Sequence, residues 1–326
     1  MKKPIIIILF SVLLPIIASI TCLAGSEAED PKMLAQRQKE MIEAALNAAD
    51  AFNENDLEKY MSFFTDDFIK ENISKPAGDK DAFRTSVAGF FKKFPGIRNY
   101  QKYLLPFKNS LVFDECTFEI PIPEKDKTIR IFHMDIVEME GNRMKVKRTF
   151  GDGATMKVAL GFIEPPIPLP QPPVATTIAD PKPTDLSPLE AQEQLQELWN
   201  KHDLSSIAEM THANAEILVS PLLAPVDRNA YIGWLELFFT AFPDIRMTPV
   251  YSDGGSDWAF SEIKLTGTNS GSYIGHPSTG KKIELGAGYL TRFDTNGLVT
   301  SLKLYVDSMV IMKQLGFKPI EISAKQ

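Results

Sequence analysis

Cysteine and histidine are scarce in this 326-residue chain, which contains two cysteines and four histidines. Cys22 lies within the first 28 residues, so cleavage of a leader would leave Cys116 alone and exclude an internal disulfide. The histidines show no HExxH-type spacing, and the thiols are too few for a structural zinc site. We therefore expect no metal, and a fold that is stable through its hydrophobic core.

Basic residues are also fewer than acidic residues. The chain has 35 lysines and arginines against 42 acidic residues, which gives a formal net charge of −7. A basic excess is what attracts nucleic acids and anionic membranes. The composition therefore argues against nucleic acid as a partner and against an anionic membrane surface.

Residues 1–28 have the layout of a secretory signal peptide. Two lysines precede an apolar run from Pro4 to Ile20, and small residues follow. The run is short for a membrane-spanning helix. Thr21 fits poorly before a lipid-anchored Cys22. We expect an exported protein, periplasmic or extracellular.

One segment of the chain occurs twice. Phe90–Arg98 reads FFKKFPGIR, and Phe238–Arg246 reads FFTAFPDIR. A second pair follows in the same order: Met156–Phe162 is MKVALGF, and Ile311–Phe317 is IMKQLGF. Self-similarity at this spacing indicates two copies of one domain.

A proline-rich interval separates the two copies. It contains eight prolines between Ile163 and Leu186, a composition that favours an extended, semi-rigid spacer. Ser187–Glu190 then combines a capping box with proline at the first helical position. We predict a leader over 1–28, a first domain over 29–162, a linker over 163–186 and a second domain over 187–326.

Aromatic residues at helical spacing mark the longer helix in the middle of the second copy. Tyr231, Trp234 and Phe238 recur in this way after the candidate N-cap Asp227. Such residues either fill a core or line a pocket, and the spacing alone leaves both open.

Period-two alternation follows the helices. It covers residues 258–265, 283–293 and 299–306, with Asn296 and Gly297 as a hairpin turn between the last two. Helices followed by hairpin-linked strands predict an α+β fold, with the helices on one face of a mainly antiparallel sheet.

The glycine-rich run Gly267–Lys281, followed by Asp307 and Gln314–Gly316, resembles the SnoaL-like polyketide cyclase (ester cyclase) family of the nuclear transport factor 2-like superfamily. The likeness covers roughly Leu189–Phe317, and the first copy is related mainly through its repeat. The resemblance implies two tandem cone-shaped domains, each with a strongly curved sheet, and a chemistry without metal or organic cofactor.

The resemblance also suggests candidate catalytic residues. In the cyclases an aspartate matching Asp307 acts as acid/base, whereas the residues around Asp307 are equally compatible with a helix N-cap. Asp152, which aligns with it in the first copy, and Glu262 on a predicted strand are further candidates. Lys303 and Asn269 stand where relatives often carry tryptophan and histidine, so the acid is kept while its helpers differ.

The predicted ligand is a small, largely apolar molecule held in a pocket of the second copy. Gly275–Lys281 matches a phosphate-binding loop only up to its lysine, and it joins two predicted strands, so we expect no nucleotide. The candidate ligand-binding residues are Tyr231, Trp234, Phe238, Trp258, His276 and Tyr289.

Three functions remain open on this basis. The first is binding of the apolar molecule, with Asp307 as a cap only. The second is a cofactor-free acid/base enzyme of the cyclase, isomerase or hydrolase type that uses Asp307. The third is an interaction module, in which the two domains pair through their sheets within the chain or in a homodimer.

Overall fold

The computed structural model describes residues 30–72, 75–107, 110–122, 126–160, 180–220 and 225–317. The predicted leader with Cys22, and most of the predicted linker, lie outside these residues. The contacts of the chain divide it into two compact units. Unit 1 contains the chain up to Glu71 together with Pro76–Thr149, and unit 2 contains Asn72–Lys75 and the chain from Phe150 onward.

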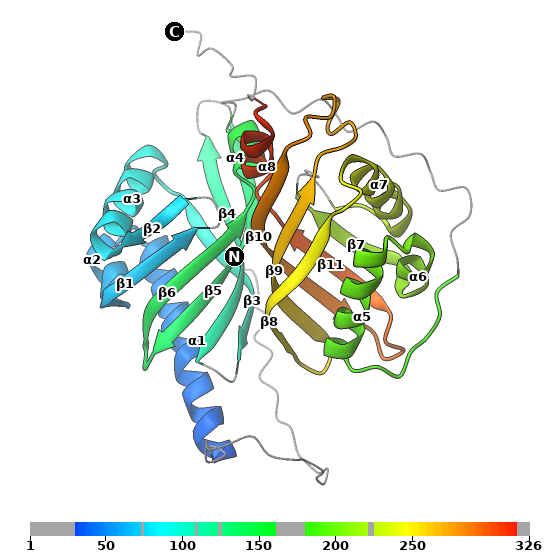
Figure 1. Ribbon diagram of the computed structural model, residues 1–326. Coiled ribbons are helices and arrows are strands. Elements are labelled where there is room, and N and C mark those ends of the chain that lie inside the picture. Colours follow the sequence, from blue (N-terminus) through cyan, green and yellow to red (C-terminus); the bar gives the residue numbers. More distant parts are fainter. Residues whose placement is uncertain are drawn as a thin grey trace. The chain divides into compact units, whose positions relative to one another are not determined.

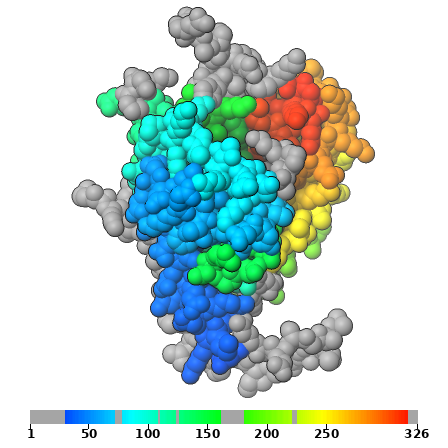
Figure 2. Space-filling view, turned by 90° about the vertical axis from the view of Figure 1, so that its left-hand side faces the viewer, coloured from blue at the N-terminus to red at the C-terminus, as the bar shows by residue number. Residues whose placement is uncertain are grey.

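Unit 1 is built on a six-stranded sheet with the order β2-β1-β6-β5-β4-β3. Three helices belong to it, and they form the blue-to-cyan surface in Figure 2. They are α1 (Pro31–Asn53), α2 (Leu57–Ser62) and α3 (Lys80–Lys93). The strands are β1 (Phe64–Asn72), β2 (Lys75–Asp79), β3 (Arg98–Pro106), β4 (Leu111–Ile122), β5 (Lys127–Glu140) and β6 (Arg143–Gly151).

Unit 2 is built on a five-stranded sheet with the order β7-β11-β10-β9-β8. In Figure 1, α5, α6 and α7 lie on one side of this sheet. The helices are α4 (Gly153–Ala159), α5 (Pro188–Lys201), α6 (Leu204–Glu209), α7 (Arg228–Ala241) and α8 (Ser308–Leu315). The strands are β7 (Thr211–Val219), β8 (Arg246–Gly254), β9 (Trp258–Thr268), β10 (Lys282–Phe293) and β11 (Val299–Tyr305).

The two sheets repeat each other. The order β1-β6-β5-β4-β3 in unit 1 has its counterpart in β7-β11-β10-β9-β8 of unit 2. Strands β8 to β11 pair antiparallel, and β11 pairs with β7 in parallel. The α+β fold with helices on curved, mainly antiparallel sheets is confirmed. The expected order, helices and then strands, is wrong at one place in each copy, because β1 and β2 precede α3, and β7 precedes α7.

Aspartate side chains begin most of the helices. A carboxylate oxygen of the N-cap residue accepts a backbone N–H of the first turn, which satisfies a donor that has no partner within the helix. The predicted capping box of Ser187 and Glu190 at α5 is confirmed. The aspartate N-caps are Asp30, Asp56, Asp79, Asp152, Asp203, Asp227 and Asp307.

Gln192 of α5 connects this helix to the sheet of unit 2. It is fully buried, and its amide donates to the carbonyl oxygens of Ala259 and Tyr289, at 2.9 and 3.1 Å. Thr291 Oγ1 accepts from the same amide at 2.9 Å, and Ser261 donates to Gln192 Oε1 at 2.7 Å. One side chain therefore fixes α5 over both β9 and β10.

None of the described helices is both long enough and apolar enough to cross a membrane.

The Gln192 contacts give a first testable prediction. Gln192→Ala should lower the free energy of unfolding by about 3 kcal/mol, because it leaves buried carbonyl and hydroxyl groups without partners. Urea unfolding followed by circular dichroism measures this. Glu193→Ala, which is exposed on the same helix, is the matched control and should change stability by less than about 0.5 kcal/mol. Equal effects of the two substitutions would contradict the role assigned to Gln192.

Candidate functional site

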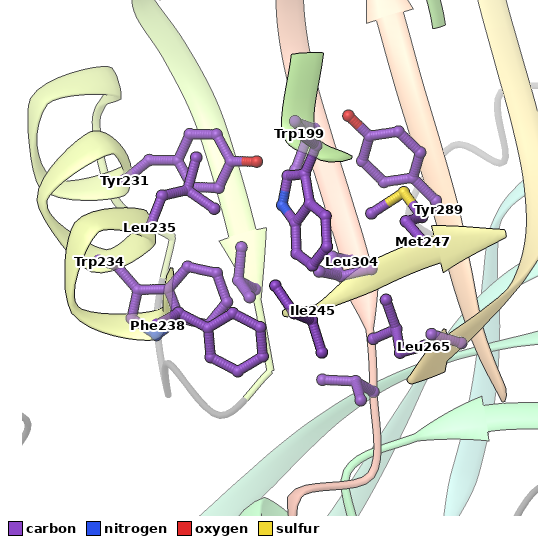
Figure 3. Close-up of a cluster of buried hydrophobic side chains, with 14 of the residues drawn as sticks. Trp199, Tyr231, Trp234, Leu235, Phe238, Ile245, Met247, Leu265, Tyr289 and Leu304 are labelled. Atoms are coloured by element: carbon purple, nitrogen blue, oxygen red, sulfur yellow. The ribbon is translucent and has the colours of Figure 1, made fainter. Parts of the chain in front are cut away.

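The helix-covered interior of unit 2 contains four of the predicted ligand-binding residues. Tyr231, Trp234 and Phe238 come from α7, and Tyr289 comes from β10 (Figure 3). These side chains are only 1–5% exposed. The rings of Trp234 and Phe238 stack with their centroids 4.9 Å apart. All four belong to one buried cluster, which also contains Trp199 of α5.

Three polar groups lie within this apolar cluster. The hydroxyl ends of Tyr231 and Tyr289 are turned toward Trp199 (Figure 3). Trp199 is 2% exposed, and its indole N–H has no hydrogen-bond partner among the described residues. Burial raises the pKa of both tyrosines, and the charge of Tyr231 adds to the rise at Tyr289. Both hydroxyls therefore stay protonated and can donate hydrogen bonds.

Trp258 and Glu262 do not face this interior. Along β9, Ala259, Ile263 and Leu265 belong to the buried cluster. Successive side chains of a strand point to opposite faces of the sheet. Trp258 and Glu262 therefore project from the other face of β9, so the structure does not bring them together with the two tyrosine hydroxyls.

His276 lies in the loop between β9 and β10, where its ring stacks on Phe317 at a centroid distance of 4.2 Å. Asn269, which is fully buried, holds this loop. Its Oδ1 accepts the N–H of Thr279 at 2.8 Å, and its Nδ2 donates to the carbonyl oxygen of Gly271 at 2.8 Å. The loop is thus a fixed connection between two strands.

Asp307 and Asp152 are N-caps of neighbouring helices in unit 2. Asp307 Oδ1 accepts the N–H groups of Met309 and Gly153, at 3.0 and 3.3 Å. Asp152 Oδ1 accepts the N–H and the hydroxyl of Ser308, at 3.1 and 2.6 Å. Each cap therefore also binds the first residue of the other helix. The carboxylates of both candidate acids accept hydrogen bonds from backbone N–H groups, as expected of helix N-caps.

Unit 1 contains a cluster of buried ionisable side chains that no sequence pattern predicted. It consists of Asp114 and Cys116 on β4, His133 and Asp135 on β5, and Lys147 on β6. Because the residues come from three strands, they form no sequence motif. The one available signal is the spacing, because residues two apart share a face of a strand, as Asp114 and Cys116 do and as His133 and Asp135 do.

Part of this cluster has the donor atoms of a metal site. Cys116, His133 and Asp135 each offer one atom, and the three atoms lie within 4.8 Å of one another. However, Asp135 Oδ2 is 2.8 Å from the ammonium group of Lys147, and the charge of Asp135 also acts on Lys70. Positive charge beside the carboxylate opposes a divalent cation, so we do not assign a metal centre here.

Comparison with known families identifies the second copy. Residues 189–315 match the model of the family described as SnoaL-like polyketide cyclase. We refer to this segment, which resembles the family, as the SnoaL-like domain. A search of curated proteins gave no match.

Solved structures similar to this chain each cover about two-fifths of it. IdmH from Streptomyces antibioticus, a proposed polyketide cyclase, is 23% identical with a TM-score of 0.37, and the match covers 40% of this chain and 99% of IdmH. A proposed SnoaL-like polyketide cyclase from Jannaschia sp. CCS1 is 17% identical with a TM-score of 0.36, and the match covers 42% of this chain and 99% of that protein. An LEH-like epoxide hydrolase from M. tuberculosis is 17% identical with a TM-score of 0.33, and the match covers 37% of this chain and 90% of that protein.

The capping role of Asp307 in the SnoaL-like domain can be tested by two substitutions. Asparagine also caps helices well, so Asp307→Asn should change the free energy of unfolding by less than about 0.5 kcal/mol, whereas Asp307→Ala should lower it by about 1 kcal/mol. Chemical denaturation of the full chain measures both. Asp185→Ala, at an exposed position outside any helix, is the control. If Asn proves as damaging as Ala, the negative charge of Asp307 matters beyond capping.

His133 makes the stability of unit 1 depend on pH. Burial, opposed by Asp135 and assisted by Lys147 and Lys70, lowers its pKa from the ordinary 6.5 to about 4. Between these values the unfolded state binds more protons than the folded state, so the contribution of His133 to stability falls as the pH falls from 6.5 toward 4, by about 3 kcal/mol in full. Asp114, whose pKa burial raises to about 7, contributes in the opposite direction over the same range. Urea unfolding of wild type and His133→Gln at each pH separates the two, because the difference between the variants contains the His133 contribution alone and should shift in favour of His133→Gln as the pH falls. A difference that does not change with pH would show that His133 titrates normally.

Proposed function

We propose that the protein is exported and that the interior of its SnoaL-like domain binds a small, largely apolar molecule. The observation that carries this proposal is the buried indole N–H of Trp199, which has no hydrogen-bond partner among the described residues. The leader-like residues 1–28 support export.

An unsatisfied donor in this position is energetically unfavourable for the protein alone. Leaving a buried polar group without a partner costs about 1–3 kcal/mol, and the indole N–H of a buried tryptophan usually finds an acceptor. A bound molecule with an oxygen acceptor would remove this penalty. The Trp199 N–H thus favours a ligand over a purely structural core.

The surroundings of Trp199 define the chemistry of that ligand. Apolar and aromatic walls with a few converging polar groups are typical of small-molecule sites. Trp234 and Phe238 provide stacked aromatic surface, while Tyr231 and Tyr289 provide hydroxyl groups. The arrangement suits a compact, uncharged molecule with one or two oxygen atoms.

The acid/base alternative has less support. Asp307 directs its carboxylate at backbone N–H groups, and Glu262 lies on the other face of β9. Neither residue faces the tyrosine hydroxyls. Binding without chemistry is therefore the function that we assign to this domain.

Two measurements test the proposal. Native mass spectrometry of the full chain, purified from the periplasm or medium of its own producer, should reveal a retained small molecule. Isothermal titration calorimetry should then measure an affinity for 1-naphthol. Trp199→Phe should weaken this affinity by roughly five- to tenfold, which corresponds to the loss of one hydrogen bond of about 1 kcal/mol.

Trp258→Phe is the matched control, since the same change is made on the opposite face of β9. It should leave the affinity for 1-naphthol unchanged, and thermal unfolding will confirm that both variants fold. Equal affinities for wild type and Trp199→Phe, together with the absence of a retained molecule, would overturn the proposal.

A further inference from the structure

Helix α3 of unit 1 is packed less closely than its counterpart α7 in unit 2. Only Val87 of α3 is buried, whereas nine residues of α7 are buried. Phe83 and Phe90 of α3 are half-buried, and the residues that match them in α7, Tyr231 and Phe238, are buried. Part of the aromatic surface of α3 is therefore accessible to a molecule from solution.

A series of ring contacts connects α3 with the polar cluster of the sheet. The centroid of the Phe83 ring is 6.2 Å from that of Tyr60 and 5.3 Å from that of Phe64. Tyr60 is buried, and its centroid is 5.0 Å from that of Phe64. Burial raises the pKa of the Tyr60 hydroxyl, and the charges that act on it include those of Asp135 and Asp114. The Tyr60 ring therefore lies between the aromatic surface and these two carboxyl groups.

Of the two carboxyl groups, one has a cation and the other does not. Asp114 and Asp135 lie opposite each other on the paired strands β4 and β5, so their side chains project from the same face. Asp135 is fully buried, and its Oδ2 is 2.8 Å from Nζ of Lys147. Asp114 is 7% exposed, and its Oδ1 has no hydrogen-bond partner among the described residues. Asp114 is thus a buried acceptor without a counter-ion in the described part of the chain.

The charges around Asp114 favour an added positive group. Burial, and then the negative charge of Asp135, raise the pKa of Asp114 to about 7. The Cys116 thiol and the charge of Lys147 have smaller, opposing effects, and Glu115 raises the pKa further. A raised pKa of this origin means that a positive charge at the carboxylate is stabilised. At low pH a proton supplies it, and at higher pH a cationic group can take its place.

Neither Lys70 nor His133 supplies this charge. The Lys70 ammonium group donates to Thr149 Oγ1, and burial lowers its pKa to about 7. Burial lowers the pKa of His133 to about 4, so its ring is uncharged at neutral pH. The groups that act on Asp114 or its neighbours are Cys116 and Glu115 on β4, His133 and Asp135 on β5, Lys147 on β6, Lys70 on β1 and Tyr60 on α2.

A ligand for these surroundings combines one positive charge with an apolar body. An ammonium group donates strong hydrogen bonds to a carboxylate, and aromatic rings such as that of Tyr60 attract its charge. Because Lys147 is bound to Asp135, a single charge at Asp114 meets less repulsion than a divalent metal ion would. The rings of Phe64 and Phe83 offer apolar contact for the rest of the molecule.

We propose that unit 1 binds a small apolar amine, with the ammonium group at the Asp114 carboxylate and the hydrocarbon part against the aromatic rings of α2, β1 and α3. This site belongs to unit 1 and does not depend on the ligand proposed for the SnoaL-like domain.

2-Phenylethylamine and 2-phenylethanol test the charge requirement, because they differ only in the ammonium and hydroxyl groups. Isothermal titration calorimetry of the full chain at pH 8, where the amine is protonated, should give an affinity for the amine at least about tenfold higher than for the alcohol. Asp114→Asn should remove this preference, since its amide carries no negative charge. Equal affinities of wild type for the two molecules, no binding of the amine, or a preference that Asp114→Asn retains would overturn the proposal.

Two control variants accompany this measurement. Asp66→Asn removes the same charge from a side chain of unit 1 that is 96% exposed and whose ion pair with Lys80 contributes little. It should keep the preference for the amine, and a loss there would show that the preference reflects only the overall charge. Trp199→Phe should leave amine binding unchanged. Weaker amine binding by this variant would place the amine in the SnoaL-like domain and would also overturn the proposal.

Amine binding should also displace the proton of Asp114. Because protonated Asp114 carries no negative charge, the affinity of wild type should rise about tenfold between pH 6 and pH 8, around a midpoint near 7. Calorimetry at pH 6 in phosphate and in ACES buffer should show release of about one proton per amine bound by wild type, and none by Asp114→Asn. The same pH dependence in both proteins would assign it to Lys70 and overturn the role of Asp114.

Discussion

A polar side chain that faces the helix-covered side of either sheet has little water to bind, and this constraint organises the whole molecule. Every such group must find a partner in the protein, bind a ligand, or remain at a cost in free energy. Gln192 shows the first outcome, since its amide contacts two strands. Trp199 and Asp114 each keep an atom without a partner among the described residues.

The two units meet the constraint in different ways on similar sheets. Unit 2 places an aromatic cluster under its helices, together with uncharged polar groups such as the Gln192 amide and the hydroxyls of Tyr231 and Tyr289. Unit 1 places ionisable groups on three strands of its sheet and pairs only some of them, as in Asp135 with Lys147. One strand order therefore supports a neutral interior in one copy and a charged interior in the other.

The sequence predicted features whose signals lie close together along the chain. Local spacing was sufficient for the capping box at Ser187, the aromatic face of α7 and the strands β9 to β11. Strand β7 was missed because its first half, with His212 and Asn214, is polar and partly exposed. The role of Asp307 could not be decided from the sequence, because a catalytic acid and a helix N-cap both require an aspartate at this position.

The charged cluster of unit 1 was beyond sequence analysis for a physical reason. Asp114 and Asp135 lie opposite each other only because β4 and β5 pair in one particular register, and a shift by one residue would move them to different faces. Trp258 shows the same limit, since its place on the other face of β9 depends on which alternate residues the helices cover.

The paired caps Asp152 and Asp307 have a consequence for how the chain can be divided. Helix α4 belongs to the first sequence repeat, yet its contacts place it in unit 2, where Asp152 binds Ser308 at the start of α8. A fragment that begins after the proline-rich interval would therefore lack α4 and leave Ser308 without this acceptor. A fragment that ends before the second repeat would likewise leave the N–H of Gly153 without Asp307, so each repeat holds a hydrogen-bond acceptor for a helix of the other.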